Sequence, residues 1–221
     1  MSAAIAQSES QDLILPGLVA LLREAADAAG AFVHEAKGPV KAKISAGGKI
    51  DRKLADVEQH AVHGYGWYAS YGELLNQVAG WAERLEADGA FGETEALLAQ
   101  LLFSEYAAQM IGGIPMNQGE TIRPADLGVA PETLEKLFAA PLLRLVNQGG
   151  GQAVKIRVAD LVAASRGKAT VEVTGLDETF EMIRDQFHAF AEEKVVPHAH
   201  GWHLRDELIP LDIIKELGDL G

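Results

Sequence analysis

The sequence predicts an all-α protein, in which a bundle of long helices is followed by the start of a second helical domain. Two observations lead to this prediction. Aromatic residues make up only 6% of the chain, and the apolar set is dominated by Ala and Leu, whose side chains lose little freedom on a helix. Apolar residues also recur at steps of three and four over long stretches, which is the periodicity of one helix face.

The composition excludes several classes of protein. The 221 residues are 48% hydrophobic and 23% charged, which is typical of a soluble globular protein. A formal net charge of −13 argues against a nucleic-acid partner and against an anionic membrane surface. The chain has no cysteine, no apolar run long enough for a membrane span and no secretion signal. We therefore expect a cytoplasmic protein with no membrane partner.

The first helix is expected after a disordered tail of residues 1–12. From Pro16, apolar residues at helical spacing predict a helix that ends at Gly30. They are Leu18, Leu21, Leu22 and Ala25. The segment 36–49 contains Gly, Pro and several Lys, which is typical of a loop.

The most regular stretch predicts a single helix of some ten turns between Ile50 and Asp88. Its stripe is Ile50, Leu54, Val57, Ala61, Tyr65, Tyr68, Tyr71, Leu75, Val78, Ala82 and Leu85. Four glycines lie inside the same stretch: Gly64, Gly66, Gly72 and Gly80. Each costs up to about 1 kcal/mol relative to Ala, so we expect them to permit close approach of another helix or of a ligand.

A further helix is predicted over residues 93–113, antiparallel to the long one because the connection is short. Its inward residues are expected to be Leu98, Leu101, Leu102, Tyr106 and Gln109. Residues 114–128 read as a loop. A helix from Pro131 to Leu145 should be bent or split by Pro141.

The remaining segments include a predicted domain boundary. Residues 147–151 form a break, and 152–166 are compatible with a helix or, at the start, with a strand. Residues 167–175 are a polar connector that contains the boundary. After it, Asp177 should cap a helix that ends at Val196-Pro197, and a last helix should begin at Pro210. The core face of the capped helix is expected to be Phe180, Ile183, Phe187, Phe190 and Ala191.

The first candidate site is the group His198, His200 and His203. Three histidines within six residues suggest a metal site. On a helix, however, positions two apart point to nearly opposite sides, unlike the i, i+4 pair of a helical zinc site. We favour a solvated or capping histidine cluster, and we predict no metal ligands.

The second candidate is an aromatic cluster on the long predicted helix. Its members are His60, His63, Tyr65, Trp67, Tyr68 and Tyr71. The cluster is compatible with a pocket wall for a planar ligand. It is equally compatible with a helix interface in which the tyrosine rings pack and the hydroxyls reach water, and we favour the interface.

The other candidate residues give weaker indications of a functional site. The glycines at 112–113 and 149–151 follow helices, so they are expected to be C-caps rather than a phosphate cradle. Asp206 and Glu207 are expected to precede a helix start, where negative charge is favourable. No serine lies in a nucleophile elbow and no carboxylate pair is placed for acid–base work, so we assign no catalytic residue.

The end of the chain resembles the N-terminal helical domain of the acyl-CoA dehydrogenases. In that family a first helix ends in a Val-Pro or Ala-Pro corner, and an acidic-hydrophobic-Pro step follows. A helix then closes on Glu-Leu-Gly-x-x-Gly. The corresponding segments here are "FAEEKVVPHA", "DELIP" and "DIIKELGDLG". The similarity covers about residues 178–221, roughly a fifth of the chain.

The resemblance implies a flavoenzyme. Members of the family hold FAD, abstract an α-proton of an acyl-CoA with a Glu and pass the β-hydride to the flavin. Their electrons leave to an electron-transfer flavoprotein, and most members are homotetramers, which implies a homo-oligomer here. The flavin motifs and the base follow the segment that matches, so no residue of this chain is assigned to either. We therefore expect the chain to stop inside a domain at Gly221.

The preceding region resembles the long helical extension that some members of the family carry. Those members oxidise (2S)-methylsuccinyl-CoA to mesaconyl-CoA in the ethylmalonyl-CoA pathway. We accordingly expect an N-terminal extension over residues 13–170 and the truncated start of the family domain over 171–221. The alternative is a non-catalytic helical interaction or oligomerisation module, suggested by the long apolar stripe and by the lack of a catalytic set. A histidine-coordinated metal protein is a third, weaker hypothesis.

Overall fold

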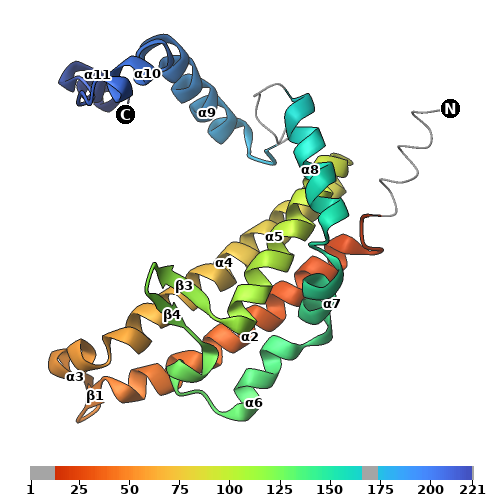
Figure 1. Cartoon of the computed structure of the whole chain (residues 1–221), viewed down its shortest axis with the longest axis vertical. Helices are drawn as coiled ribbons and strands as arrows, with labels where there is room; N and C mark the ends of the chain where they lie inside the picture. Colours follow the sequence, from red (N-terminus) through yellow and green to blue (C-terminus); the bar gives the residue numbers. More distant parts are fainter. Residues whose placement is uncertain (1–12, 166–173, 221) are drawn as a thin grey trace. The chain divides into compact units, whose positions relative to one another are not determined.

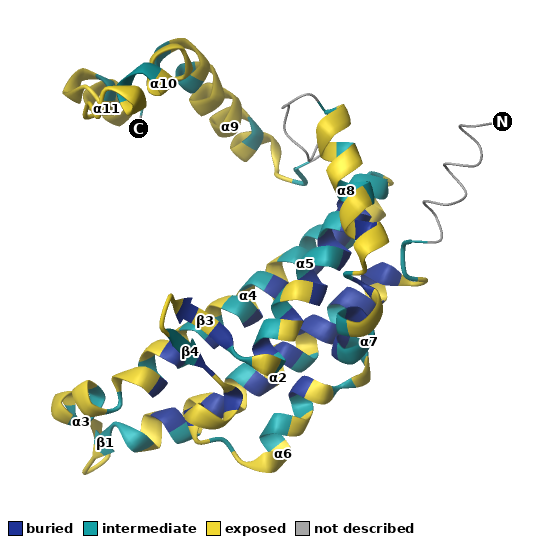
Figure 2. Ribbon diagram, in the orientation of Figure 1, coloured by how far each residue is buried: buried dark blue, intermediate teal, exposed yellow. Residues whose placement is uncertain are grey.

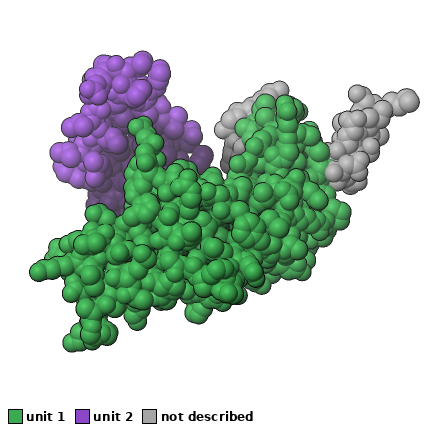
Figure 3. Space-filling model, turned by 60° about the horizontal axis from the view of Figure 1, so that its bottom comes forward, with its two compact units in different colours: residues 1–173 green, residues 174–221 purple. Residues whose placement is uncertain are grey.

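The computed structural model describes residues 13–165 and 174–220, which divide into two compact units (Figures 1 and 3). Unit 1 comprises residues 1–173 and unit 2 comprises residues 174–221. The predicted disordered tail and the predicted boundary between residues 170 and 171 both lie outside the described residues. The described part is mainly helical, with two small sheets, so the predicted all-α class is confirmed.

The first helix, α2 (Leu18–Lys43), is longer than predicted. It continues through Gly30 and contains Pro39, so the expected end at Gly30 and the expected loop after residue 36 are both wrong. Beyond Gly30 the helix buries Phe32, Ala36 and Val40 in the core of unit 1. Burial of these side chains outweighs the local cost of one glycine and one proline.

A small tip follows α2 and interrupts the predicted ten-turn helix. The strands β1 (Ser45–Ala46) and β2 (Lys49–Ile50) form an antiparallel hairpin, and the short helix α3 (Arg52–Val57) comes next. Asp51 caps α3, because its side chain accepts hydrogen bonds from the backbone N–H of Lys53 and Leu54. The long helix therefore begins only after Glu58, and Ile50 and Val57 are exposed instead of lying on its apolar stripe.

The remainder of the predicted stripe lies on α4 (Gln59–Ala87), which packs antiparallel to α2 (Figure 1). Five stripe residues are buried, as expected: Ala61, Tyr68, Leu75, Ala82 and Leu85. Two of the four glycines have packing reasons. A β-carbon at Gly64 would collide with the Ile122 side chain, and one at Gly72 would lie 3.0 Å from Val33 Cγ2. The other two, Gly66 and Gly80, are not in such tight contact.

The helix α5 (Glu93–Gly112) has the predicted span but buries a different face. The five residues that were expected to face inward are only half-buried: Leu98, Leu101, Leu102, Tyr106 and Gln109. The buried positions are Glu95, Ala96, Leu97, Ala99, Gln100, Phe103, Ser104, Ala107 and Met110. An apolar helix that packs on several neighbours has no single apolar stripe, so periodicity alone selected the wrong face.

The segment after α5 is a hairpin where a loop was predicted. Strands β3 (Ile114–Asn117) and β4 (Glu120–Ile122) pair antiparallel, with a bulge between Pro115 and Asn117. Ile114 and Ile122 lie opposite each other and are both fully buried. The 3₁₀ helix η1 (Pro124–Leu127) follows directly. The hairpin forms because these two isoleucines reach the core beside α4.

The last part of unit 1 is a series of short helices. They are α6 (Pro131–Leu134), the 3₁₀ helix η2 (Glu135–Phe138), α7 (Ala140–Gln148) and α8 (Gln152–Ala164). The predicted split is confirmed, with Pro141 in the first turn of α7. Gly149 ends α7, as the predicted break requires. Residues 152–164, which the sequence left open, are helical.

Unit 2 consists of helices with no buried residue in its described part (Figure 2). They are α9 (Glu178–Phe190), the π-helical segment η3 (Ala191–Val195), α10 (Val196–Leu204) and α11 (Leu211–Asp219). Asp177 caps α9 as predicted, and α11 follows Pro210. The predicted end at Val196-Pro197 is wrong, because Pro197 lies in the first turn of α10, where a missing N–H is tolerated.

Within the described ranges, no helix is both long enough and apolar enough to cross a membrane.

Candidate functional site

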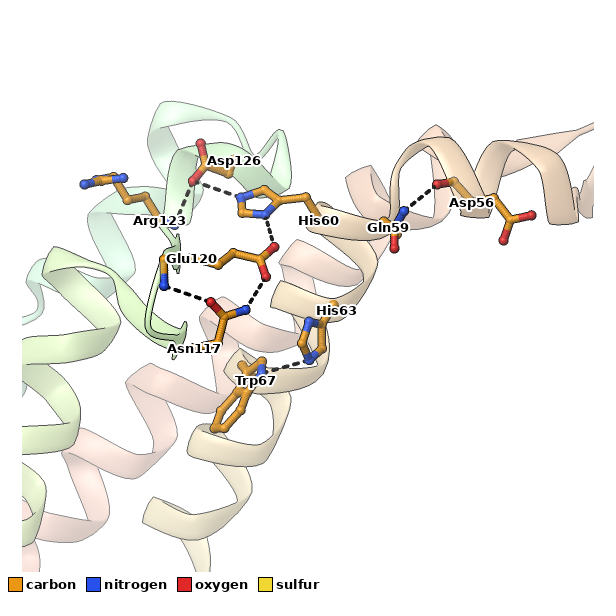
Figure 4. Close-up of polar contacts among 10 residues, drawn as sticks. Asp56, Gln59, His60, His63, Trp67, Asn117, Glu120, Arg123 and Asp126 are labelled. Carbon is orange, nitrogen blue, oxygen red and sulfur yellow. Dashed lines mark hydrogen bonds and ion pairs between the residues drawn. The ribbon is translucent and has the colours of Figure 1, made fainter.

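A group of polar contacts in unit 1 surrounds His60, in the first turn of α4 (Figure 4). Its Nδ1–H donates to Glu120 Oε1 on β4 at 2.8 Å, and its Nε2 lies 3.8 Å from Asp126 Oδ2 in η1. The imidazole therefore lies between two carboxylates from two other elements. Glu120 is the first residue of β4, and Asp126 lies in η1, which follows β4 closely.

The two carboxylates are themselves held by neighbours (Figure 4). Asn117 Nδ2 donates to Glu120 Oε2 at 2.8 Å, and the backbone N–H of Arg123 donates to Asp126 Oδ2 at 2.8 Å. The hydrogen bond from His60, and after it the one from Asn117, holds the pKa of Glu120 below its usual value. Glu120 is therefore ionised at neutral pH and ready to accept both bonds.

This cluster joins the hairpin to α4 and contains no assembled catalytic set. It has a base and two carboxylates, but no hydroxyl nucleophile is hydrogen-bonded to the imidazole. Throughout residues 13–165 and 174–220, no three His, Cys, Asp or Glu side chains are grouped so that they could hold a metal ion. The cluster around His60 instead holds α4 to β4 and η1 through polar contacts.

A row of aromatic rings continues from this cluster along α4 and onto α5. Trp67 Nε1–H donates to His63 Nε2 at 3.1 Å, and the Trp67 ring meets Tyr71 edge-on with centroids 6.2 Å apart. Tyr71 packs on Tyr106 of α5 at 4.5 Å and donates to Gln109 Oε1 at 2.8 Å. The structure thus places Tyr71 at the α4–α5 contact, whereas His63 is exposed and contacts Trp67 on the same helix.

The other two tyrosines of the predicted cluster point elsewhere. Tyr68 is fully buried, packs against Phe32 at 5.4 Å and donates its hydroxyl to the Met110 carbonyl at 3.0 Å. Tyr65 is half-buried and lines a hollow between α2 and α4. The predicted aromatic cluster is therefore divided among the core, the α4–α5 contact and this hollow.

The three histidines near the end of the chain all lie on α10 and are exposed. His198 packs against Trp202, with ring centroids 5.7 Å apart. His200 and His203 are not grouped with a carboxylate as metal ligands would be. The structure therefore does not bring these side chains together at one site.

Close packing accounts for Gly113 and Gly150 in the two glycine clusters, whereas a β-carbon at Gly112 or Gly151 would meet no atom within 4 Å. Gly113 has a φ of 126°, and a β-carbon there would lie 2.8 Å from Thr121 Cγ2. A β-carbon at Gly150 would lie 2.5 Å from Ser104 Oγ on α5. Both sites are filled by neighbouring protein atoms, so they do not form an open cradle for a phosphate.

The acidic pair Asp206 and Glu207 lies between α10 and α11, before the start of α11. Glu207 forms a two-bond ion pair with Arg205, with both N–O distances at 2.8 Å. Asp206 has a φ of 54°, a left-handed conformation that Asp tolerates better than most residues. Glu207 therefore also forms an ion pair within the turn that follows α10.

Sequence reasoning missed the polar residues that organise unit 1. Gln100 is completely buried and bonds three backbone groups, and Glu120 and Asp126 hold His60. A polar residue in the middle of an apolar helix was the one available signal for Gln100. Nothing in the local sequence linked His60 to carboxylates about sixty residues away.

Comparison with known proteins provides independent information. Residues 177–221 match the family described as "Acyl-CoA dehydrogenase, N-terminal domain". The chain is also 43% identical over 211 residues to a (2S)-methylsuccinyl-CoA dehydrogenase of Cereibacter sphaeroides. That match covers 94% of this chain but spans only 37% of the length of the relative.

The two matches agree with the resemblance that the sequence motifs suggested, and that resemblance is confirmed. The family match lies within unit 2, whereas the similarity to the curated relative extends over 94% of the chain and so includes most of unit 1. Unit 1 is therefore similar to a region of that relative outside the segment matched by the family.

Proposed function

We propose that this chain is the N-terminal part of an FAD-dependent acyl-CoA dehydrogenase that oxidises (2S)-methylsuccinyl-CoA to mesaconyl-CoA. One observation carries the proposal: the 43% identity covers 94% of the chain. Similarity confined to residues 177–221 would support only the broad family. Similarity that continues through unit 1 supports the group of enzymes that carries the same helical extension.

The chemistry of such an enzyme requires groups that the described residues do not supply. Bound FAD accepts a hydride, and a carboxylate base removes the α-proton. A flavin pyrophosphate needs open backbone donors, whereas Gly113 and Gly150 are both covered by neighbouring side chains. Gly113 and Gly150 therefore do not offer such donors, and we derive no step of the reaction from the described residues.

In this proposal unit 2 supplies the first helices of the catalytic body. The helices α9 and α11 are strongly amphipathic by sequence, and their apolar side chains are exposed. They include Phe180, Ile183, Phe187, Leu211, Ile214 and Leu217. A helix face that exposes several large apolar side chains is unfavourable in water. We propose that further helices of the same enzyme cover them.

The test is the flavin spectrum of the full-length enzyme that carries this chain. We expect bound flavin, and we expect (2S)-methylsuccinyl-CoA to bleach its absorbance under anaerobic conditions. Butyryl-CoA serves as the control for general acyl-CoA dehydrogenase activity. Bleaching by butyryl-CoA alone would refute the substrate, and a protein without flavin would refute the class. Transfer of electrons to an electron-transfer flavoprotein, a homo-oligomer and a cytoplasmic location remain predictions.

A second candidate function for unit 1 is a non-catalytic interaction or oligomerisation module. It is favoured by the observation that unit 1 has a continuous core of its own and no catalytic set among its described residues. Deletion of residues 1–173 from the full-length enzyme distinguishes the two roles. Loss of subunit association with retained flavin reduction would support the module, whereas loss of substrate reduction would assign unit 1 a part in catalysis.

A further inference from the structure

The helix α8 carries more apolar surface than unit 1 covers. Only four of its thirteen residues are polar: Gln152, Lys155, Arg157 and Asp160. A helix that is apolar on most sides is normally buried on most sides. Of these thirteen residues, all within the described part of the chain, only Val154 is buried, whereas α2 buries ten residues and α5 buries nine. Most of the apolar surface of α8 therefore lies outside the core of unit 1 (Figure 2).

Two ion pairs fix the orientation of α8 on α5. The Nε and Nη2 atoms of Arg157 each donate to a carboxylate oxygen of Glu93 at 2.7 Å. The Nζ atom of Lys155 lies 2.6 Å from Glu105 Oε1. Successive residues on a helix are rotated by about 100° around its axis. Because the residues on both sides of Ile156 reach back to α5, Ile156 points away from α5, and its side chain is 54% exposed.

The side of α8 that faces solvent has an apolar stripe. Ile156, Ala159 and Ala163 follow one another at steps of three and four, which places them on one face of the helix. All three are exposed. We call these three residues the outer face of α8. Single exposed apolar residues are common on protein surfaces, but a second apolar stripe on a helix that already packs on α5 is typical of a helix with two packing partners.

The outer face of α8 is too small to hold a separate molecule by itself. A helix of thirteen residues is about 20 Å long, so one face offers on the order of a few hundred Å². A stable interface between separate proteins buries about 800 Å² on each partner. A partner on the same chain needs less area, because the connection keeps it at a high effective concentration. The outer face therefore suits a tethered partner rather than a second copy of this chain.

The polypeptide that follows unit 1 is such a tethered partner. Residues 177–221 match the N-terminal domain of the acyl-CoA dehydrogenases, and residues 165–176 are all that separate them from the end of α8. A connection of this length spans at most about 40 Å. The similar dehydrogenase of Cereibacter sphaeroides is matched over only 37% of its length, so most of that enzyme lies outside the matched region.

We propose that the outer face of α8 docks unit 1 onto the catalytic body of the same enzyme, in the part that follows residue 221. Ile156 is the anchor of this contact, because it is the largest of the three side chains and is held outward. The ion pairs of Lys155 and Arg157 fix the helix before docking, which reduces the conformational entropy lost in the contact. The inference rests on the proposed function only in that the chain continues into a larger enzyme.

The first test compares side-chain labelling by a photogenerated carbene in the 221-residue chain and in the full-length enzyme. Ile156 should be labelled in the 221-residue chain and at least about fivefold less in the full-length enzyme, because a docked anchor is shielded from solvent. Val57, at the end of α3, is 78% exposed and is the control that should be labelled equally in both. Equal labelling of Ile156 in the two proteins overturns the proposal. Protection of Ile156 already in the 221-residue chain also overturns it, because unit 2 or a second copy then covers the face.

The second test is the substitution Ile156→Asp. The full-length enzyme should unfold on heating in one cooperative transition, and the variant should show a separate transition for unit 1, because the contact would bury an unpaired carboxylate. In the 221-residue chain the same substitution should shift the unfolding temperature of unit 1 by less than about 2 °C, since residue 156 faces water there. Val57→Asp is the matched control and should leave one transition in the full-length enzyme. One transition in full-length Ile156→Asp would contradict the docking role of the outer face.

These outcomes are separate from the test of the activity. A full-length protein that protects Ile156 but binds no flavin would refute the proposed function and leave the docking inference in place. A full-length flavoprotein in which Ile156 is labelled freely would do the reverse.

Discussion

At the scale of single residues, Gln100 decides how three segments of unit 1 meet. Its Oε1 accepts from the Leu15 N–H at 2.8 Å, and its Nε2 donates to the carbonyls of Leu13 and Gly149 at 3.0 and 3.1 Å. The side chain is fully buried, so these bonds satisfy the polar atoms of an amide that lies away from water. One amide on α5 therefore fixes both the chain before α2 and the end of α7.

We predict that Gln100→Leu lowers the free energy of unfolding by about 3 kcal/mol. The substitution keeps the volume but leaves buried backbone groups without partners, which costs roughly 1–3 kcal/mol for each group. Urea unfolding of the variant measures the change. Gln77→Leu, at an exposed amide on α4, is the control and should shift stability by at most about 0.5 kcal/mol. Equal effects at the two positions would contradict the bonding role of Gln100.

Tyr68 makes the stability of unit 1 depend on pH in the alkaline range. Burial raises the pKa of the Tyr68 hydroxyl, and the negative charge of Asp126 raises it further. An acid whose pKa is raised by folding contributes stability that is complete below its unfolded pKa, about 10 for tyrosine. That contribution is lost as pH rises above this value, because only the unfolded chain releases the proton easily.

The corresponding prediction is that the free energy of unfolding falls above about pH 10, and that Tyr68→Phe reduces this fall. Tyr65 and Tyr71 also have pKa values raised by burial, so some pH dependence should remain in the variant. Urea titrations of both proteins between pH 8 and 11 provide the measurement. Parallel stability curves for the two proteins would show that Tyr68 does not titrate in this way.

At the scale of elements, the glycines of α4 separate into two kinds. Gly64 lies directly against Ile122 of β4, which leaves no room for a side chain, whereas Gly66 on the next part of the helix surface faces open space. The first glycine allows the β3–β4 hairpin to approach α4. The second costs helix stability without a packing benefit within the described residues.

Matched alanine substitutions should therefore have opposite effects. Gly64→Ala is expected to destabilise unit 1 by about 2 kcal/mol, because β4 must shift to admit the methyl group. Gly66→Ala is expected to stabilise it by up to about 1 kcal/mol through helix propensity alone. Thermal unfolding of the two variants makes the comparison. The same sign for both would mean that hairpin contact does not limit position 64.

At the scale of the whole molecule, the two units differ in how much apolar surface they bury. Unit 1 has a continuous core that includes Phe32, Tyr68 and Phe103. The described residues of unit 2 include none that is buried, and Phe180 on α9 and Leu211 on α11 are exposed. Isolated short helices without tertiary packing are marginal in water.

We expect hydrogen exchange to reflect this difference in the 221-residue chain. The amides of α2, α4 and α5 should be protected up to the global stability of unit 1, and those of α9, α10 and α11 should exchange many times faster. In the full-length enzyme of the proposed function, α9 to α11 should become protected. Strong protection of these helices in the 221-residue chain alone would contradict the inference that unit 2 has no buried core of its own among its described residues.

Several features of the fold followed from local sequence. Asp177 and Pro210 marked helix starts correctly, and Pro141 marked a split, because capping and the missing proline N–H act within one turn. Gly30 and Pro39 were misleading. Their local cost is small compared with burying the α2 residues that follow Gly30, and no neighbouring residue reveals that burial.

The candidate site was less predictable than the helices. The aromatic residues at 60–71 were found, but their division among the core, the α4–α5 contact and the hollow between α2 and α4 depends on where α2 and α5 lie. The pairing of His60 with Glu120 and Asp126 joins residues about sixty positions apart. Such long-range contacts leave no periodic trace in the sequence.

The sequence by itself determined the helical class, most helix ends and the resemblance of residues 178–221 to the acyl-CoA dehydrogenases. These depend on spacing, capping and motifs, which are local properties of the chain. Only the tertiary structure decided which face of α5 is buried, that residues 114–122 form a hairpin and that Gly30 lines a hollow between α2 and α4. These depend on which distant side chains exclude water together, and burial is a property of the assembled fold rather than of any single segment.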